Sequence, residues 1–206
     1  MCSAANPSEA AAYPPSKTAL VLLDYHNLLF TRIQGDTRSK LTSSVKALSK
    51  AARDNGVPII HGLIGFKGLP AETSKLRARL EEGIQSMVEK EPQLAEEFGE
   101  FASGGDSDNE ITVYRTGTVS ALRSEGIHEF LKSKGVQSLI IGGISTTGTV
   151  LSTAREATDS GYVVTVARDA CWDPIEESHR VLLEHVLPMT AWVAGHDEAM
   201  KLLAGS

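Results

Sequence analysis

The sequence predicts an α/β protein, a three-layer α/β/α sandwich built on a mainly parallel sheet. Short apolar runs of the kind that form buried strands alternate along the chain with segments in which apolar residues recur at helical spacing. This alternation favours parallel strands joined by helices that cover both faces of the sheet. The length of 206 residues fits one such domain.

The composition excludes several other classes of protein. Hydrophobic residues make up 41% of the chain and charged residues 22%, which supports a sizeable core and argues against disorder. The formal net charge is −6 and no basic block occurs, so we expect no nucleic-acid partner. No apolar run reaches the roughly 18 residues of a membrane-spanning helix, so we expect no membrane association.

The cysteines and the first residues bear on localisation. Cys2 and Cys171 are the two cysteines of the chain, and we expect no structural disulfide between them, which fits a reducing compartment. The first residues lack the basic start and apolar core of a signal peptide. We therefore expect a cytoplasmic protein, although secretion without a leader would leave no trace in the sequence.

The first part of the chain contains two predicted strands and one clear predicted helix. Residues 1–16 are rich in Ala, Pro and Ser, and two consecutive prolines oppose regular structure, so we interpret them as a flexible arm before a domain over 17–206. The run TALVLLD (18–24) predicts a strand buried on both faces, and VPIIHGLI (57–64) predicts a second. Apolar residues at helical spacing predict a helix over 36–55.

Residues 68–110 form a long insertion before the regular pattern returns. The charged stretch from Glu72 to Lys90 predicts a helix, Pro92 to Phe101 predicts another, and SGGDSDN (103–109) predicts a loop. Insertions of this length often carry elements that shape a substrate site.

The second half of the chain returns to alternating strands and helices. The predicted strands cover 110–115, 136–144, 162–170 and 189–193. The predicted helices cover 120–134, 147–160, 175–187 and 196–203.

Chemically active side chains follow the carboxyl ends of the predicted strands. In a parallel sheet these ends meet at one edge, where ligands bind. The candidate segments on this rule are Asp24 with His26, His61 to Lys67, Tyr114 with Arg115, Ser145 to Thr149, and Asp169 to Asp173.

Three segments resemble motifs of one family. LLDYHN (22–27) resembles the first-strand motif of isochorismatase-like hydrolases, in which an aspartate ends the strand. VYRTGTVSAL (113–122) resembles the strand that carries the family's lysine, and GISTTGTVLSTAREATDSGYVVTVARDA (143–170) is similar to the segment in which a cysteine opens a helix. The resemblance covers roughly residues 17–204, is fairly specific, and implies the isochorismatase-like hydrolase fold.

The resemblance assigns three catalytic positions, two of which depart from the family's pattern. The family's usual aspartate falls at Asp24, its lysine at Arg115, with Thr116 as the neighbouring alternative, and its nucleophilic cysteine at Thr149. Threonine is a poor nucleophile unless a base removes its proton, and a guanidinium does not release its proton. A cysteine-type amidase is therefore disfavoured.

The isochorismatases proper imply a second mechanism. Their aspartate, here Asp24, acts as general acid on the vinyl ether of isochorismate, water adds, and pyruvate leaves. Thr149 would then shape the pocket, Arg115 would bind a substrate carboxylate, and the backbone N–H groups of Thr147 to Thr149 would cradle an oxyanion or carboxylate. Protonation of Asp24 beside Arg115 is electrostatically unfavourable, unless carboxylates of the substrate neutralise the arginine.

Six further residues are expected to contact the substrate, namely His26, Tyr114, Thr147, Gly148, Cys171 and Trp172. Three of them also have a plainly structural interpretation. His26 could bond only the local backbone, Cys171 could be a small buried residue rather than a displaced nucleophile, and Trp172 could pack a turn.

We expect no metal and no cofactor, because His26 and His61 without a third ligand make a weak metal site. The resemblance implies a homodimer or homotetramer. The predicted function is hydrolysis of a small carboxylated metabolite. The alternatives are an amide hydrolase with Thr149 or Cys171 as nucleophile, and a non-catalytic binding or regulatory protein that kept the fold.

Overall fold

A six-stranded parallel sheet organises the computed structural model, which describes residues 6–102 and 108–206. Its strands are β1 (Thr18–Leu23), β2 (Ile59–Ile64), β3 (Glu110–Arg115), β4 (Ser138–Ile144), β5 (Val163–Trp172) and β6 (Trp192–Ala194). They lie in the order β3-β2-β1-β4-β5-β6, and every neighbouring pair is parallel. The predicted mainly parallel α/β architecture is confirmed.

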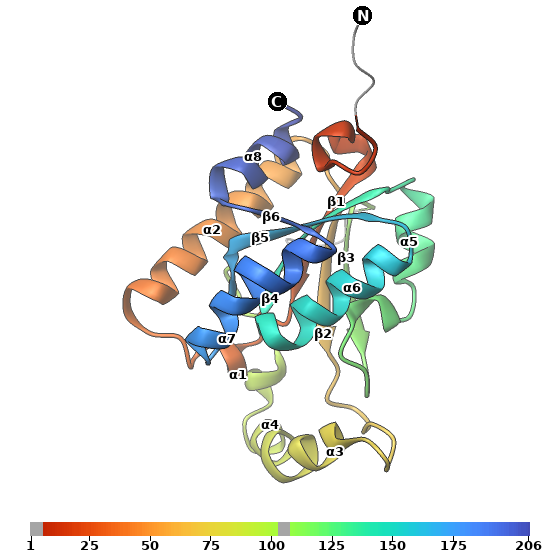
Figure 1. Cartoon of the computed structure of the whole chain (residues 1–206). Coiled ribbons are helices and arrows are strands. Elements are labelled where there is room, and N and C mark those ends of the chain that lie inside the picture. The colour runs from red at the N-terminus through yellow and green to blue at the C-terminus, as the bar shows by residue number, and fades with distance from the viewer. Residues whose placement is uncertain (1–5, 103–107) are drawn as a thin grey trace, which may run out of the picture.

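Helices cover both faces of the sheet (Figure 1). The α-helices are α1 (Asn27–Phe30), α2 (Gly35–Asp54), α3 (Lys75–Arg79), α4 (Ser86–Lys90), α5 (Ile127–Ser133), α6 (Leu151–Asp159), α7 (Glu176–Val181) and α8 (His196–Ala204). Helices α2 and α8 pack on one face, and α5 and α6 pack on the other. No helix in the described ranges combines the length and apolar character needed to cross a bilayer.

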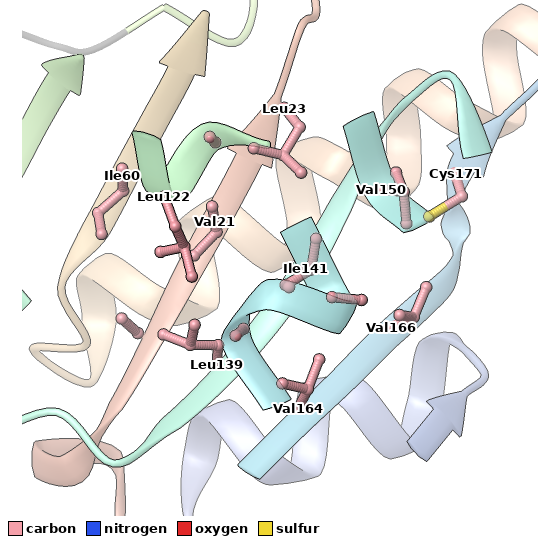
Figure 2. Packing of buried hydrophobic residues seen from close by; sticks show 14 of the residues in the cluster. Val21, Leu23, Ile60, Leu122, Leu139, Ile141, Val150, Val164, Val166 and Cys171 are labelled. Carbon is pink, nitrogen blue, oxygen red and sulfur yellow. The ribbon is translucent and has the colours of Figure 1, made fainter. Parts of the chain in front are cut away.

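The central strand β1 is buried on both faces, as its continuous apolar run predicts. Ala19, Val21 and Leu23 point into the core beneath α5 and α6, whereas Leu20 and Leu22 point into the core beneath α2 and α8. Figure 2 shows part of the first of these cores, where strand side chains such as Val21 and Ile141 lie among side chains of helical segments such as Leu122 and Val150. The strand ends, and therefore the site that follows them, are held by a rigid centre.

Three of the predicted helices differ from the observed ones. The predicted helix over 120–134 is divided, because Gly126 adopts φ 80° and α5 begins only after it. The predicted helix from Glu72 to Lys90 begins at Lys75 and contains a π-helical segment between α3 and α4. The predicted helix over 92–101 is wrong beyond a short 3₁₀ turn at Pro92–Ala95.

The chain after that turn is extended because its backbone groups bond to the segment that follows β1. The N–H of Asn27 donates to the carbonyl of Glu96, and the N–H of Phe98 donates to that of Tyr25. Phe98 and Phe101 then pack against Phe30, with Phe98 stacked on its ring at a centroid distance of 4.3 Å. This aromatic contact fixes the end of the insertion beside the carboxyl edge of the sheet.

The predicted flexible arm over 1–16 falls partly outside the described residues, since 1–5 are not described. Its remainder carries regular structure where the sequence predicts a loose segment. Two short 3₁₀ helices form here, Ala10–Ala12 and Pro15–Lys17. Trp192 Nε1 donates to the carbonyl oxygen of Ser8 at 2.7 Å, which attaches the segment to β6.

Gly143 allows β4 to approach the end of β1. A Cβ atom at Gly143 would lie 2.5 Å from the Cβ of Leu23 and 2.8 Å from its carbonyl oxygen. Because Asp24 follows Leu23 and Thr149 follows β4, this close approach brings two of the predicted catalytic residues together.

Substitution of Gly143 tests this constraint. We expect Gly143→Ala to lower the free energy of unfolding by about 3 kcal/mol, because the added methyl group overpacks a backbone contact that has no space to relax. Urea denaturation measures the change. Gly83→Ala is the control, since a Cβ there meets nothing within 4 Å, and its effect should stay within about 1 kcal/mol. Equal stability of the wild type and Gly143→Ala would contradict the constraint.

Candidate functional site

Asp24 lies immediately after β1 in an unusual backbone conformation. Its φ of 56° is in the left-handed region, which a non-glycine residue adopts rarely and mostly at functional sites. Its side chain accepts a hydrogen bond from the N–H of Ile64 to Oδ1 at 2.8 Å and is only 5% exposed. The carboxylate therefore points across the end of β2 towards β3.

Arg115, the last residue of β3, forms a buried ion pair with Asp24. Its Nη1 donates to Oδ1 at 3.0 Å and its Nη2 donates to Oδ2. The guanidinium is 3% exposed, so neither charge is screened by bulk water. Thr116, the alternative to Arg115, is exposed and donates its hydroxyl to the carbonyl of Lys67, away from this pair.

Thr149 contacts the same guanidinium group that pairs with Asp24. It lies in the π-helical segment Thr146–Val150 that follows β4, and its Oγ1 accepts a hydrogen bond from Arg115 Nη2 at 3.0 Å. The structure thus brings together the three residues that the sequence predicts as catalytic. We call Asp24, Arg115 and Thr149 the floor cluster, because they form the base of the pocket described next.

A cavity of about 160 Å³ opens above the floor cluster, and its walls are mostly apolar. Leu28 and Phe66 come from segments after β1 and β2, and Trp172 ends β5. The insertion adds a further apolar wall made by Leu76, Leu80 and Ile84. The long insertion therefore covers the site, a role that its sequence left undetermined.

The guanidinium of Arg115 is not free to bind a substrate carboxylate, which is the role that the sequence predicts for it. Both of its Nη atoms are engaged by Asp24, so it does not present a free fork to a substrate carboxylate. Arg32 lines the same pocket and is exposed. It provides a second cation that sequence reasoning missed, because a lone arginine after a short helix carries no recognisable signal.

The backbone N–H groups of Thr147 to Thr149, which the sequence predicts as a cradle for an oxyanion or carboxylate, are not all free to bind one. The N–H of Thr147 donates to Asp173 Oδ2 at 2.8 Å, and the N–H of Gly148 donates to the carbonyl of Ser145 at 3.2 Å. Asp173 closes this turn from the end of β5, which consumes a donor that an oxyanion would need. Thr147 and Gly148 do not line the pocket, whereas Ser145 does.

Of the other predicted contact residues, Trp172 lines the pocket and Tyr114 does not. Tyr114 is 59% exposed, because alternate side chains of a strand point to opposite faces and Arg115 occupies the inner one. Cys171 is likewise on the opposite side from Trp172, where it packs near Val150 in the core (Figure 2). Burial raises the pKa of the Cys171 thiol to about 12, so a displaced cysteine nucleophile is not supported.

His26 lies behind Asp24 and is completely buried, outside the set of pocket-lining residues. Its Nε2 is 3.1 Å from the carbonyl oxygen of Ile64, and a carbonyl only accepts, so Nε2 carries the hydrogen. Its ring meets Phe66 edge to face at 5.3 Å. Burial lowers the pKa of His26, while the nearby charge of Asp24 acts to raise it and that of Arg115 acts to lower it.

Both ring nitrogens of His61 are engaged by carboxylates. His61 is sandwiched between two carboxylates, with Nδ1 2.8 Å from Glu97 and Nε2 2.9 Å from Glu110. Glu110 is also held by Arg53 at 2.7 Å. Within the described ranges, no group of three or more His, Cys, Asp or Glu side chains is arranged to hold a metal ion.

The pKa values of His61 and Glu110 in this second buried cluster are shifted. Burial acts to lower the pKa of His61, but the hydrogen bonds with Glu110 and Glu97 outweigh burial and raise it to about 9. Burial acts to raise the pKa of Glu110, but the hydrogen bonds from His61 and Arg53 lower it to about 2. His61 is therefore a cation at neutral pH, and it ties the end of the insertion to β2 and β3.

Comparisons with known proteins agree with this fold. The model of the isochorismatase domain matches residues 18–198. The uncharacterised isochorismatase family protein YecD of Escherichia coli O157:H7 is 27% identical over 187 residues, which cover 90% of this chain and 96% of that protein.

Solved structures share the fold at low sequence identity. A cysteine hydrolase from Pseudomonas syringae pv. phaseolicola has a TM-score of 0.76 at 16% identity, covering 93% of this chain and 94% of its own. N-carbamoylsarcosine amidase from Thermoplasma acidophilum has a TM-score of 0.68 at 20% identity, covering 88% of this chain and 98% of its own.

The charge on His61 predicts a pH dependence of stability. Since the pKa of His61 rises from 6.5 to about 9 on folding, its contribution is complete below pH 6.5 and is lost as the pH rises through 9. We expect the difference in unfolding free energy between wild type and His61→Gln to shrink over this range, by an amount of the order of 3 kcal/mol.

Urea denaturation at a series of pH values measures this difference. His128→Gln, which alters an exposed histidine of α5, is the matched control and should give a difference that does not vary in the same way. A wild-type to His61→Gln difference that stays constant from pH 6 to pH 9.5 would show that His61 is not a buried cation.

Burial of Cys171 predicts an unreactive thiol. In a Cys2→Ser background, iodoacetamide should leave Cys171 unmodified in the native protein at pH 7.5, because the thiolate is scarce and the sulfur is covered. Mass spectrometry measures the modification, and the same protein in urea should react fully. Rapid native alkylation would return Cys171 to the list of candidate nucleophiles.

Proposed function

The chain belongs to the isochorismatase family, and on this premise we propose that it hydrolyses a small carboxylated metabolite by vinyl-ether cleavage, with Asp24 as general acid. The observation that carries the proposal is the floor cluster, a buried carboxylate and guanidinium at the base of a mostly apolar pocket. Buried titratable groups in such a pocket are typical of catalytic sites.

The position of Thr149 supports a mechanism without a side-chain nucleophile. Its hydroxyl oxygen accepts a hydrogen bond from Arg115, and among the described residues no carboxylate or imidazole is bonded to it. A hydroxyl needs an adjacent base to become nucleophilic, and the described residues place the cation of Arg115, not a base, in hydrogen-bond contact with Thr149. Vinyl-ether hydrolysis needs only a proton donor and a water molecule.

The reaction follows from the arrangement around Asp24. A protonated Asp24 would transfer its proton to the terminal vinyl carbon, which leaves an oxocarbenium ion that water attacks before the product splits into pyruvate and an alcohol. Donors from Arg115 and Ile64 stabilise the carboxylate that remains.

The pocket supports a compact substrate with one apolar part and one carboxylate. A volume of about 160 Å³ limits its size, and walls such as Phe66 and Trp172 suit a ring. Arg32 offers the charge-assisted hydrogen bonds that a carboxylate requires. Arg32 therefore replaces Arg115 as the proposed carboxylate-binding residue.

Amide hydrolysis is the second candidate function. One protein with the same fold is an N-carbamoylsarcosine amidase, and Thr149 occupies the position that the resemblance assigns to the nucleophile. This route needs Thr149 to attack a carbonyl carbon and is therefore destroyed by Thr149→Ala. A binding protein without turnover would show neither activity, in the wild type or in the Asp24→Asn and Thr149→Ala variants.

Release of pyruvate from isochorismate tests the proposal. We expect Asp24→Asn to reduce kcat by about 10²-fold to 10⁴-fold, because the proton donor is lost, and Thr149→Ala to retain activity within about 10-fold. Coupled oxidation of NADH by lactate dehydrogenase measures pyruvate continuously. Circular dichroism must confirm that Asp24→Asn is folded, because it leaves the guanidinium of Arg115 buried without its counter-ion.

Arg32→Gln separates binding from chemistry in the same assay, and it should raise KM more than it lowers kcat. Loss of pyruvate release in Thr149→Ala but not in Asp24→Asn would reverse the assigned roles. Absence of pyruvate release by the wild type would rule out isochorismate as substrate. Small amides assayed with wild type and Thr149→Ala would then decide between an amidase and a binding protein.

A further inference from the structure

His26 has one ring nitrogen that is buried and has no hydrogen-bond partner among the described residues. This atom is Nδ1, since Nε2 bonds the carbonyl oxygen of Ile64. Nδ1 lies 4.0 Å from Asp24 Oδ1. A buried polar atom without a partner is costly and calls for an explanation.

The surroundings of Nδ1 act on the protonation of His26 in opposite directions, and burial, which lowers the pKa of the ring, is the largest influence. The charged groups near the ring are the carboxylate of Asp24, which favours an imidazolium, and the guanidinium of Arg115, which opposes it. The backbone of Asp24 also favours the charged ring. The remaining neighbours are the edge of Phe66 and the bridge to Glu97, whose carboxylate is occupied by His61. The carboxylate of Asp24 is therefore the nearby group that can exchange a proton with Nδ1.

We propose that His26 shares one proton with Asp24, receiving it on Nδ1 and returning it to Oδ1. This inference rests on the proposed function, because it supplies the proton that Asp24 needs as general acid. The distance of 4.0 Å must shorten to about 3 Å for the transfer. His26 does not line the pocket, so it acts through Asp24 as a positioning residue.

The protons balance over one turnover. Before the chemical step, His26 transfers the single shared proton from its Nδ1 to Oδ1 of Asp24. Asp24 then loses that proton as the C–H bond forms on the vinyl carbon, which leaves neither group with the shared proton. The water that adds to the oxocarbenium carbon loses one proton, which restores the protonated Asp24–His26 pair. No proton is gained or lost by the protein, and the net reaction consumes one water.

Sharing also explains how Asp24 functions beside Arg115. The carboxylate of Asp24 accepts three hydrogen bonds, from the N–H of Ile64 and from both Nη atoms of Arg115. A nearby imidazole stores the proton while the ion pair of Asp24 and Arg115 stays intact. The shared proton then belongs to the pair and not to either residue alone.

A purely structural role for His26 is the competing explanation. Its bond to Ile64 and its contact with Phe66 could serve only to hold the wall of the pocket. His26→Gln separates the two roles, because its amide N–H can replace the Nε2 donor whereas it has no titratable atom at Nδ1. His128→Gln is the matched control at an exposed histidine.

The first measurement needs no turnover. Nitrogen-15 NMR of histidine-labelled protein, assigned with His26→Gln, follows the ring of His26 from pH 4 to pH 8 in wild type and in Asp24→Asn. We expect an Nε2–H tautomer at high pH and a titration midpoint that moves to lower pH in Asp24→Asn, since the carboxylate that favours the imidazolium is gone. An unchanged midpoint, or no titration of His26 in the wild type, would overturn proton sharing.

The second measurement uses pyruvate release. We expect His26→Gln to lower kcat by at least about 10-fold with KM within about 3-fold, and to remove one limb of the pH profile of kcat. His128→Gln should keep both. A wild-type kcat and pH profile in His26→Gln would leave only the structural role. If the wild type releases no pyruvate, the NMR coupling alone decides whether the pair shares a proton.

Discussion

The buried ion pair between Asp24 and Arg115 is the interaction on which the rest of the site depends. It joins the ends of β1 and β3 across β2, and its second guanidinium nitrogen extends the connection to Thr149 after β4. Removing one partner of such a pair leaves an uncompensated charge in a poorly hydrated place, which costs about 3 to 5 kcal/mol. The geometry of the site and the stability of the sheet edge are therefore coupled.

A second ionic cluster holds the segment that lies next to the site. His61, held by Glu97 and Glu110, fastens the end of the insertion to the sheet, and the same segment pairs with the backbone that carries His26. The apolar wall of the pocket comes from the other end of that insertion, at Leu76 and Leu80. One insertion thus covers the pocket and also supports the segment that carries Asp24 and His26.

The sequence predicts the sheet and the floor cluster because both follow from local rules. A strand such as β1 is apolar at every position since both of its faces are buried, and parallel strand ends converge whatever the rest of the chain does. The sequence does not predict the partners of His61 and Thr147, because both partners lie on segments that are distant along the chain. Glu97 lies in a segment that has helical composition but bonds to another segment, and Asp173 reaches its turn through a neighbouring strand.

The hydrogen bond from Arg115 to Thr149 determines what environment a different side chain at position 149 would meet. A permanent cation already lies 3.0 Å from the side chain that stands in the nucleophile position. A thiol placed there would have its ionised form favoured by that charge. The fold therefore already supplies a stabilising charge for an anion at this position, and a single Thr149→Cys substitution would place a thiol beside it.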